Sequence, residues 1–564
     1  MNKTGKYVYV PILLIIFSIH SLCGQQSKSN QISEKIALIT DRNLYIAGEN
    51  IKFSAILQTE DNTQQSFNSV VLYCEVITPG GKKICGNKYI IANNLSSGDI
   101  LIPGDIATGI YYLRAYTRYM RNWGPSSYNY TIIKIVNASR REIQQTDKNT
   151  GPSESIYETS KPGDSANTFK IVLDKSGYKR REQVNLIVDG GKSGHLPISG
   201  LSLAVIPDNT LSSSKVSLTE IVQNESDIFY SRETQGPSVT GKLVDNSYGT
   251  PAGDSRINLS VMGKQKDFMA QQTDSAGRFF FSMPEYYGYH DLFLSTDDSN
   301  HSKLKILVDN DFCTIPVNIP LSTFNLAQGE RDVSFQMAVN LQIGSYFNVD
   351  SLTDKVIDLS EESAFYGKPS DIIYIDNYVN LPTLEEYFNS LPSLVKVRKH
   401  LGEKYFKIIG TQSGLSDFDP LVLVDMAAIS DPMKVLAIAP LSISRIEVVN
   451  SLYIKGDQKY GGIINIITKK SDFGGIDLPS SGIFINYCFL SERNFPTTVL
   501  QQETNRPDTR NTLYWEPQLV LNNQNISKIS FITSDTPGKH LIVLRWVDIK
   551  GEINCQISEF EVRK

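Results

Sequence analysis

The chain has 564 residues, which is too long for a single hydrophobic core and indicates about three to five domains. Lys and Arg number 55 against 60 Asp and Glu, so the net charge is −5 and no basic stripe is available to neutralise a phosphate backbone. We therefore expect no nucleic-acid partner.

The N-terminus has the pattern of a secretory signal. Lys3 and Lys6 precede an uncharged stretch at 7–19 that is too short to span a bilayer, and small residues follow up to Gly24. We expect residues 1–24 to be a signal peptide and the mature chain to be exported to the periplasm or the outer membrane. A lipid anchor at Cys23 is the alternative, although Leu22 replaces the small residue usual before a lipidated cysteine. No later apolar run approaches the roughly 20 residues of a transmembrane helix.

Five cysteines remain after the signal, and they lack the Cys-x-x-Cys spacing of zinc or redox sites. Cys74 and Cys85 flank the turn at 79–81 and fall diagonally across the expected hairpin. In an oxidising compartment they could form a disulfide, and the sequence leaves both the bonded and the free state open.

Alternation of apolar and polar residues, interrupted by Gly, Asn, Asp and Pro, predicts a mainly β protein built of antiparallel β-sandwiches. We expect the first sandwich at 30–138, with one buried face formed by Ile51, Phe53, Ala55 and Leu57. Residues 139–167 are polar, have few aliphatic side chains and are interpreted as a linker.

A second sandwich is expected at 168–235 because its entry repeats that of the first. Tyr178-x-x-x-Glu182-x-Val184-x-Leu186 matches Tyr45-x-x-x-Glu49-x-Ile51-x-Phe53 at an offset of 133 residues.

Three further units complete the expected order. Residues 236–312 predict a third sandwich, with Asp274 and Gly277 in a tight turn. Residues 313–472 predict an α+β unit, because Thr383 as N-cap and Glu386 three residues later mark a helix start. Residues 473–564 return to alternation and predict a separate C-terminal sandwich.

Four stretches resemble known domains. Asp41-Arg42-x-x-Tyr45-x-x-Gly48-Glu49 and Gly109-x-Tyr111-x-Leu113-Arg114-Ala115-Tyr116-Thr117 resemble macroglobulin-type domains of bacterial alpha-2-macroglobulins and of envelope proteins. The unit from Gly241 to Leu294 is similar to the carboxypeptidase regulatory-like domain, a prealbumin-like sandwich. The motifs at 419–425, 443–448 and 460–470 look like the plug domain of TonB-dependent receptors. The segments at 510–515 and 533–538 resemble the sandwich that closes such plug-containing envelope proteins.

The resemblance implies a plug-like domain without its transport barrel. A 22-stranded barrel with strands of roughly 9 to 11 residues cannot fit in the 94 residues after Lys470. The chain also departs from the plug pattern at Met426, where the family usually has Gly. We therefore do not expect the chain itself to be a transporter.

Several residues invite a chemical interpretation. His400-Leu401-Gly402-Glu403 has the His-x-x-Glu spacing of zinc carboxypeptidases, but a third ligand is not evident, and we interpret it as a turn between strands. His195, His290 and His301 are interpreted as surface residues, whereas His540 falls on a strand of another unit. Gly191-Lys192-Ser193 resembles the end of a phosphate-binding loop, but Leu186 stands where the first Gly is needed, so a hairpin turn is favoured. Cys23-Gly24-Gln25-Gln26 resembles a thioester motif but lies at the signal cleavage site.

Two sets of polar residues belong to expected strands. Asp425 and Glu447 are conspicuous carboxylates that could do acid–base work, although such residues more often cap turns or face solvent. Tyr and Arg side chains gather at 111–121 and could form a recognition surface or an ordinary amphipathic sheet face: Tyr111, Tyr112, Arg114, Tyr116, Arg118, Tyr119 and Arg121.

These observations predict a non-enzymatic binding or scaffold protein of the cell envelope, accessory to an outer-membrane transport or surface complex. Its expected partner is an envelope or outer-membrane protein, and we predict no catalytic, cofactor-binding or metal-binding residues. The alternative is a macroglobulin-type protease-binding protein without a thioester, with 139–167 as the segment that proteases would cut. A peptidase would require metal at His400 and Glu403.

Overall fold

A computed structural model shows a mainly β protein whose strands form several antiparallel sheets, as the sequence predicts. It describes residues 33–59, 68–144, 169–191, 198–211, 229–263, 266–297, 304–317, 319, 324–347, 364–391, 393–455, 458–492 and 506–564. The expected signal peptide, Cys23 and positions 145–167 of the expected linker lie outside these residues.

The first sandwich packs the sheet β1-β3-β6 against the sheet β2-β8-β7-β4-β5. Ile51, Phe53, Ala55 and Leu57 point into its core, which confirms the expected face. The opposite face of β3 is also buried, because Ile56 packs against Val547 of the second sandwich. Its elements are β1 (Glu34–Thr40), β2 (Leu44–Ile46), β3 (Asn50–Thr59), β4 (Val71–Ile77), β5 (Lys83–Ile90), β6 (Leu95–Leu101), β7 (Gly109–Tyr116), η3 (Tyr119–Trp123), η4 (Pro125–Ser127) and β8 (Asn129–Val136).

The second sandwich is assembled from two distant parts of the chain. Its sheets are β30-β11-β9 and β10-β32-β31-β12-β29. The expected separate sandwiches at 168–235 and 473–564 are therefore one unit, and this part of the domain division was wrong. Its strands are β9 (Lys170–Leu173), β10 (Gly177–Tyr178), β11 (Gln183–Asp189), β12 (Ile198–Pro207), β29 (Tyr514–Glu516), β30 (Ile526–Ile532), β31 (Gly538–Asp548) and β32 (Ile553–Val562).

Burial explains why neither part forms a sandwich alone. Strand β11 turns Val184, Leu186 and Val188 inward, and these side chains share a core with Ile542 and Leu544 of β31. Strand alternation reveals which residues face inward, but it does not reveal which strands cover them.

The third sandwich, expected at 236–312, also borrows a strand from the C-terminal region. It packs β16-β13-β18 against β15-β14-β17-β28, and β28 comes from a range that we had assigned to the last sandwich. Asp274 accepts backbone hydrogen bonds from Ala276 and Arg278 at 2.9 and 2.7 Å, and Gly277 has φ +72°, so the expected tight turn is confirmed. The strands are β13 (Ser238–Asp245), β14 (Arg256–Val261), β15 (Asp267–Gln272), β16 (Arg278–Ser282), β17 (Tyr289–Thr296), β18 (Leu304–Val308) and β28 (Ile483–Cys488).

The α+β domain has the mixed sheet β19-β24-β27-β22-β23. Alternate residues of β22 pack on opposite sides, since Val422 and Val424 face α2 whereas Leu421 and Leu423 face the third sandwich. The oxygen Oγ1 of Thr383 accepts from the Glu386 backbone N–H at 3.3 Å, so the predicted helix start is confirmed. Its elements are β19 (Asp371–Tyr374), η6 (Ile375–Asn377), α2 (Leu384–Ser390), β20 (Val395–His400), β21 (Glu403–Ile408), η7 (Leu415–Asp417), β22 (Leu421–Val424), β23 (Ala427–Ala428), α3 (Pro432–Leu436), η8 (Pro440–Ser442), β24 (Ile443–Val449), β25 (Tyr453–Lys455), β26 (Gln458–Tyr460), β27 (Ile463–Thr468) and η9 (Phe473–Gly475).

The unit expected at 313–472 is not continuous, because its first part belongs elsewhere. Cys313 lies in the core of the first sandwich, and helix α1 (Gln328–Phe347) packs Met337 and Ala338 against Ile46 of β2. Among the helices that the structure describes, none has the length and apolar character of a membrane-spanning helix.

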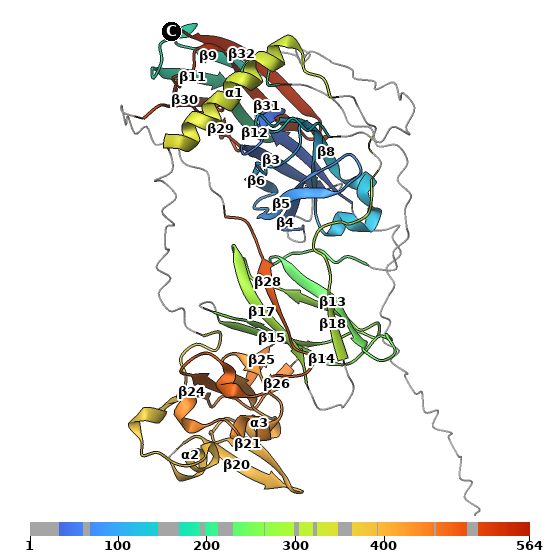
Figure 1. Cartoon of the computed structure of the whole chain (residues 1–564), viewed down its shortest axis with the longest axis vertical. Coiled ribbons are helices and arrows are strands. Elements are labelled where there is room, and N and C mark those ends of the chain that lie inside the picture. The colour runs from blue at the N-terminus through green and yellow to red at the C-terminus, as the bar shows by residue number, and fades with distance from the viewer. Residues whose placement is uncertain are drawn as a thin grey trace, which may run out of the picture.

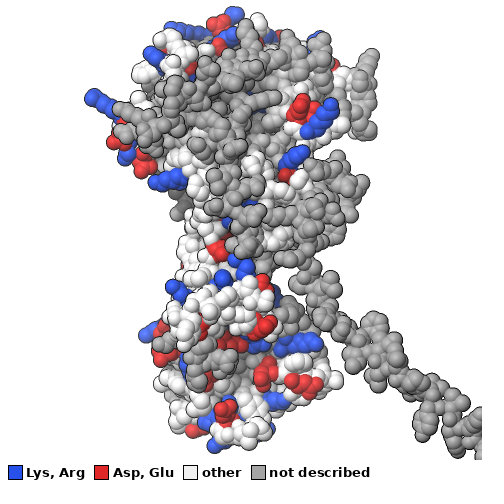
Figure 2. Space-filling model, turned by 90° about the vertical axis from the view of Figure 1, so that its right-hand side faces the viewer, with Lys and Arg blue, Asp and Glu red and all other residues white. Residues whose placement is uncertain are grey.

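The four units form an elongated molecule (Figure 1). The first and second sandwiches lie together at one end with α1 across them, the third sandwich lies in the middle, and the α+β domain occupies the other end. Lys and Arg are interspersed with Asp and Glu over the face seen in Figure 2.

Candidate functional site

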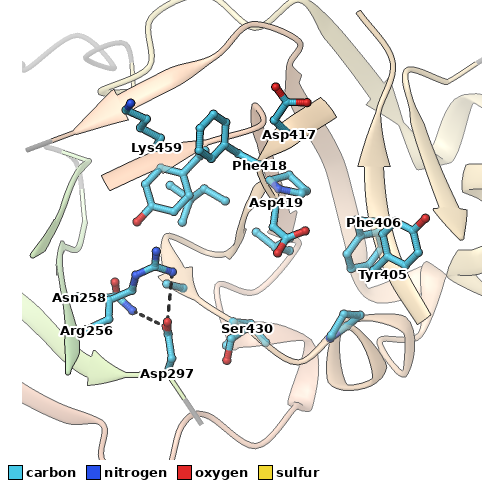
Figure 3. A pocket seen from close by; sticks show the side chains of 17 residues that line it. Arg256, Asn258, Asp297, Tyr405, Phe406, Asp417, Phe418, Asp419, Ser430 and Lys459 are labelled. Atoms are coloured by element: carbon cyan, nitrogen blue, oxygen red, sulfur yellow. Dashed lines mark hydrogen bonds and ion pairs between the residues drawn. The ribbon is translucent and has the colours of Figure 1, made fainter. Parts of the chain in front are cut away.

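A cavity of about 470 Å³ lies where the third sandwich meets the α+β domain. This volume is within the range of small-ligand sites. Strand β14 contributes one wall, and the α+β domain contributes the others through β21, the segment before β22, the segment after β23, and β26 (Figure 3).

The wall formed by the third sandwich is a paired polar network. Arg256 lies 3.2 Å from Asp297 through Nη1, and its Nε donates to Oε1 of Gln458 at 3.1 Å. Asn258 donates to the same Asp297 carboxylate at 3.2 Å (Figure 3). The ring of Tyr460 lies 5.5 Å below the Arg256 guanidinium. Because these groups satisfy one another, this wall is held in a fixed arrangement.

The opposite wall carries Asp417, Phe418 and Asp419, all exposed (Figure 3). Within the described ranges neither carboxylate makes an ion pair within 4 Å. The ammonium of Lys459 lies 5.8 Å from the Phe418 ring centre, and Tyr405 closes another side. This wall therefore offers free carboxylates next to aromatic faces.

The lining offers the kinds of group that hold a small ligand. It supplies hydrogen-bond donors, acceptors and aromatic surface. Over the described residues as a whole, no cluster of three His, Cys, Asp or Glu side chains could hold a metal ion.

Among the described residues, no third ligand joins His400 and Glu403 in a metal site. They are opposite residues at the end of the β20–β21 hairpin, and Leu401 and Gly402 form the turn between them. The turn interpretation is confirmed.

Asp425 and Glu447 each have structural partners. Asp425 lies in the β22–β23 turn and accepts from the Thr468 backbone N–H at 2.8 Å and the Phe473 N–H at 2.9 Å. Glu447 is buried and accepts from Tyr366 Oη at 2.5 Å and Arg445 Nε at 2.7 Å. Asp425 thus caps a turn, whereas Glu447 neither caps a turn nor faces solvent.

The Tyr- and Arg-rich segment at 111–121 lies in the interior. Tyr111, Tyr112, Arg114, Tyr116, Arg118 and Tyr119 are buried, and Arg121 is half-buried. The recognition-surface hypothesis was therefore wrong, and so was the expectation of an amphipathic face, because both faces of β7 are covered.

The cysteines and histidines are dispersed. The thiols of Cys74 and Cys85 are free. In the register of β4 and β5, Cys74 lies opposite Asn87 and Cys85 lies opposite Val76, which confirms that the two cysteines are diagonal neighbours. His290 is half-buried, and its Nε2 lies 3.0 Å from the Tyr287 carbonyl in an exposed part of the third sandwich. His540 lies on β31 as expected. Lys192, Ser193, His195 and His301 lie outside the described residues.

Sequence reasoning missed the cavity. Its two walls are separated by more than 100 residues along the chain, and no local pattern pairs them. The closely spaced carboxylates of Asp417 and Asp419 around an aromatic residue were the available signal.

Neither a protein-family model nor a curated protein matches the chain. Among solved structures, Salmonella alpha-2-macroglobulin reacted with methylamine aligns at 9% identity over 94% of this chain and 39% of that chain, with a TM-score of 0.23. Native E. coli alpha-2-macroglobulin aligns at 10% identity over 94% and 40%, with a TM-score of 0.24. Dimeric latent PorU from Porphyromonas gingivalis aligns at 10% identity over 49% and 33%, with a TM-score of 0.16. The chain spans about two fifths of the macroglobulins, and these TM-scores are too low to define a shared fold.

Proposed function

We propose that this chain is a non-enzymatic scaffold protein of the bacterial cell envelope that holds its α+β domain at a fixed distance from its two-sandwich end. The observation that carries the proposal is the set of buried polar contacts that lock every junction between the units. Interfaces between independently moving domains are usually solvated, whereas the groups named below are buried and contact one another across each junction, which favours a fixed arrangement of the units.

The first junction joins the first sandwich, the second sandwich and α1. Arg42 lies 2.7 Å from Glu49, and Glu49 accepts from Asn511 Nδ2 at 2.7 Å. Asn511 in turn accepts from Asn340 of α1 at 2.8 Å, and Thr512 donates to Asp41 at 2.6 Å. Burial would lower the pKa of Arg42, but the carboxylates of Glu49 and Asp41 raise it, so the guanidinium stays charged. All six side chains are buried.

The second junction joins the first and third sandwiches. Buried Lys88 pairs with Asp311 and donates to the Tyr487 hydroxyl at 3.0 Å. Arg118 donates to Thr240 Oγ1 at 3.0 Å. Lys88 and Arg118 of the first sandwich thus have buried hydrogen-bond partners on the third sandwich, which favours one fixed arrangement of the two units.

The third junction carries the α+β domain. Met426 has φ +75°, a conformation that favours glycine, yet its side chain packs against Phe268 and Ala270 of β15. The Met426 carbonyl also accepts from Ser260 Oγ at 2.8 Å. The residue that departs from the plug pattern thus forms a contact that holds the two units together.

An elongated protein with fixed junctions can bind a partner and hold it at a set distance, which is the role of a scaffold and not of an enzyme. If the chain is exported, it has this role in the cell envelope. The alternative, protease binding, needs preferential cleavage within 139–167. Limited proteolysis of the purified chain with several proteases of different specificity tests it, because cleavage confined to this segment would favour it over the scaffold.

The test of the proposal is affinity purification of the tagged chain from detergent-solubilised envelopes of the organism that encodes it, followed by mass spectrometry of each membrane fraction. Stoichiometric recovery of an outer-membrane or surface protein supports the scaffold. Recovery as a free monomer in the soluble fraction contradicts it. Ser260→Ala and Met426→Ala variants serve as probes of the third junction, since loosening it should weaken the complex without removing any surface residue.

A further inference from the structure

The β20–β21 hairpin lies at the far end of the elongated molecule, opposite the two-sandwich end (Figure 1). Its turn consists of Leu401 and Gly402, with φ angles of +49° and +93°. Leu401 is 92% exposed, more than any other large hydrophobic side chain of the described residues.

Leucine is a poor choice for this turn. Two-residue hairpin turns with positive φ at both positions favour Asn-Gly or Asp-Gly, and a bulky residue with positive φ is strained. Leu401 receives no packing in return, because almost all of its surface contacts solvent. Strain that folding does not explain points to a role in function.

The hairpin is also strongly basic within an acidic protein. Its 14 residues, 395–408, carry five Lys and Arg against the carboxylate of Glu403. Lys396 lies opposite Lys407, and Lys399 lies opposite Lys404. Like charges directly opposite each other destabilise a strand pair, so this pattern also works against folding.

Two of these cations remain free for a partner. Lys404 pairs with Glu385 at 2.6 Å, and Lys396 donates to the Phe388 carbonyl at 3.1 Å. Arg398 and Lys399 are exposed, and neither has a carboxylate within 4 Å in the described part of the molecule.

We propose that this hairpin docks on the surface of an anionic lipid bilayer. Arg398 and Lys399 face the phosphates while Leu401 enters the boundary between headgroups and acyl chains. The exposed Leu401 favours a bilayer over a soluble polyanion, because a soluble polyanion has no apolar region in which the leucine could be buried. The inference rests on the proposed envelope role for access to a membrane.

The test is flotation of the purified full chain with vesicles of phosphatidylcholine, with and without about one third phosphatidylglycerol. We expect binding to the anionic vesicles that weakens as salt increases. Leu401→Asn should reduce the partition constant by at least about tenfold, as removal of a buried leucine predicts. The same variant should raise thermal stability, because Asn tolerates positive φ. A purely structural role for Leu401 would not produce these opposite effects.

Arg398→Gln/Lys399→Gln should weaken binding about fivefold for each charge removed. The matched controls lie at the other end of the molecule. Lys179→Gln/Arg180→Gln removes an adjacent exposed basic pair, and Leu101→Asn removes a leucine that is 61% exposed. Both controls should bind like the unsubstituted chain.

Three results would overturn the inference: absence of binding to anionic vesicles, equal losses in the controls, or charge-dependent binding that Leu401→Asn leaves unchanged, which would indicate a soluble polyanion. Cell fractionation separates this failure from that of the proposed function. If the protein is found in the envelope but does not bind vesicles, only the docking inference is contradicted. If it is found in the cytoplasm, the proposed envelope role is contradicted as well.

Discussion

The hydroxyl of Tyr45 donates a 2.7 Å hydrogen bond to the carboxylate of Asp41, four residues earlier in the chain. Tyr178 donates to Asp174 in the same way at the entry to the second sandwich. In both places the residue after the tyrosine donates its N–H to the glutamate of the motif, at 2.7 Å for Glu49 and 2.6 Å for Glu182. The sequence repeat is therefore a repeat of one hydrogen-bonded strand entry.

The tyrosine hydroxyl should contribute more to the free energy of unfolding in the first copy of the strand entry than in the second. Tyr45 is completely buried, and its loss leaves one oxygen of Asp41 without that donor, so Tyr45→Phe should lower the free energy of unfolding by about 1–3 kcal/mol. Tyr178→Phe should cost only about 0.5–1.5 kcal/mol, because Asp174 is exposed to water. Urea unfolding of both variants measures the difference, and equal losses would contradict this account.

Arg114 and Glu75 form an ion pair at 2.7 Å in which both side chains are fully buried. Arg114→Met should lower the free energy of unfolding by about 3–5 kcal/mol, since it leaves the Glu75 carboxylate uncompensated. Glu75→Leu combined with Arg114→Met should recover most of this loss, because no charge then remains in the core. A double-mutant cycle measures the coupling. If the two losses simply add in the double variant, Arg114 and Glu75 are not energetically coupled. The exposed pair Lys539–Glu559 is the control, with an expected coupling below about 1 kcal/mol.

Local features were predictable from the sequence. The Thr383 cap, the Asp274 turn and the strand-entry repeat each depend on residues within about 15 positions of one another, where side-chain chemistry determines the backbone. The inward face of β3 followed from alternation alone.

The predictions that failed concern features that depend on partners far away along the chain. Strand β31 has the same alternation whether it pairs within its own region or with β12, so the discontinuous second sandwich was not visible. The charged residues Arg114 and Arg118 suggested a surface, because their buried partners Glu75 and Thr240 lie far from them along the chain and were not visible in the sequence. The cavity required the placement of Arg256 next to the α+β domain, which no sequence pattern encodes.

Burial raises the pKa of Glu233, which accepts from Tyr73 Oη at 3.0 Å and from Ser238 Oγ at 2.6 Å. A raised folded-state pKa contributes stability that is present below the unfolded pKa and is lost as pH rises through the folded value. Glu233→Gln should therefore gain stability over the unsubstituted chain at pH 7, and the gap should close as pH falls below about 4.5, the ordinary pKa of Glu. Thermal unfolding across this pH range measures the gap. Exposed Glu559→Gln is the control, and a gap that is independent of pH would contradict the assignment.

Burial also lowers the pKa of His540, whose ring stacks on Phe560 with centroids 5.5 Å apart. A lowered folded-state pKa contributes stability that is present above the unfolded pKa and is lost as pH falls toward the folded value. The second sandwich should therefore lose stability below about pH 6.5, the ordinary pKa of His, whereas His540→Phe should remove this dependence. Hydrogen exchange of β31 and β32 at pH 7.5 and pH 5.5 isolates the effect from titrations elsewhere. Unchanged protection in the unsubstituted chain at the lower pH would contradict it.

Met426 combines a strained backbone with a buried side chain, so Gly and Ala at this position should separate the two effects. Met426→Ala keeps the positive φ and loses the packing against Phe268, with an expected loss of about 2–4 kcal/mol. Met426→Gly loses the same packing but relieves the backbone, so it should be about 1 kcal/mol more stable than the Ala variant. Hydrogen exchange of β15 measures opening of this junction, with the unsubstituted chain most protected, Gly next and Ala least. If the Gly variant were instead more stable than the unsubstituted chain, the Met426 side-chain contact would not hold the α+β domain in place.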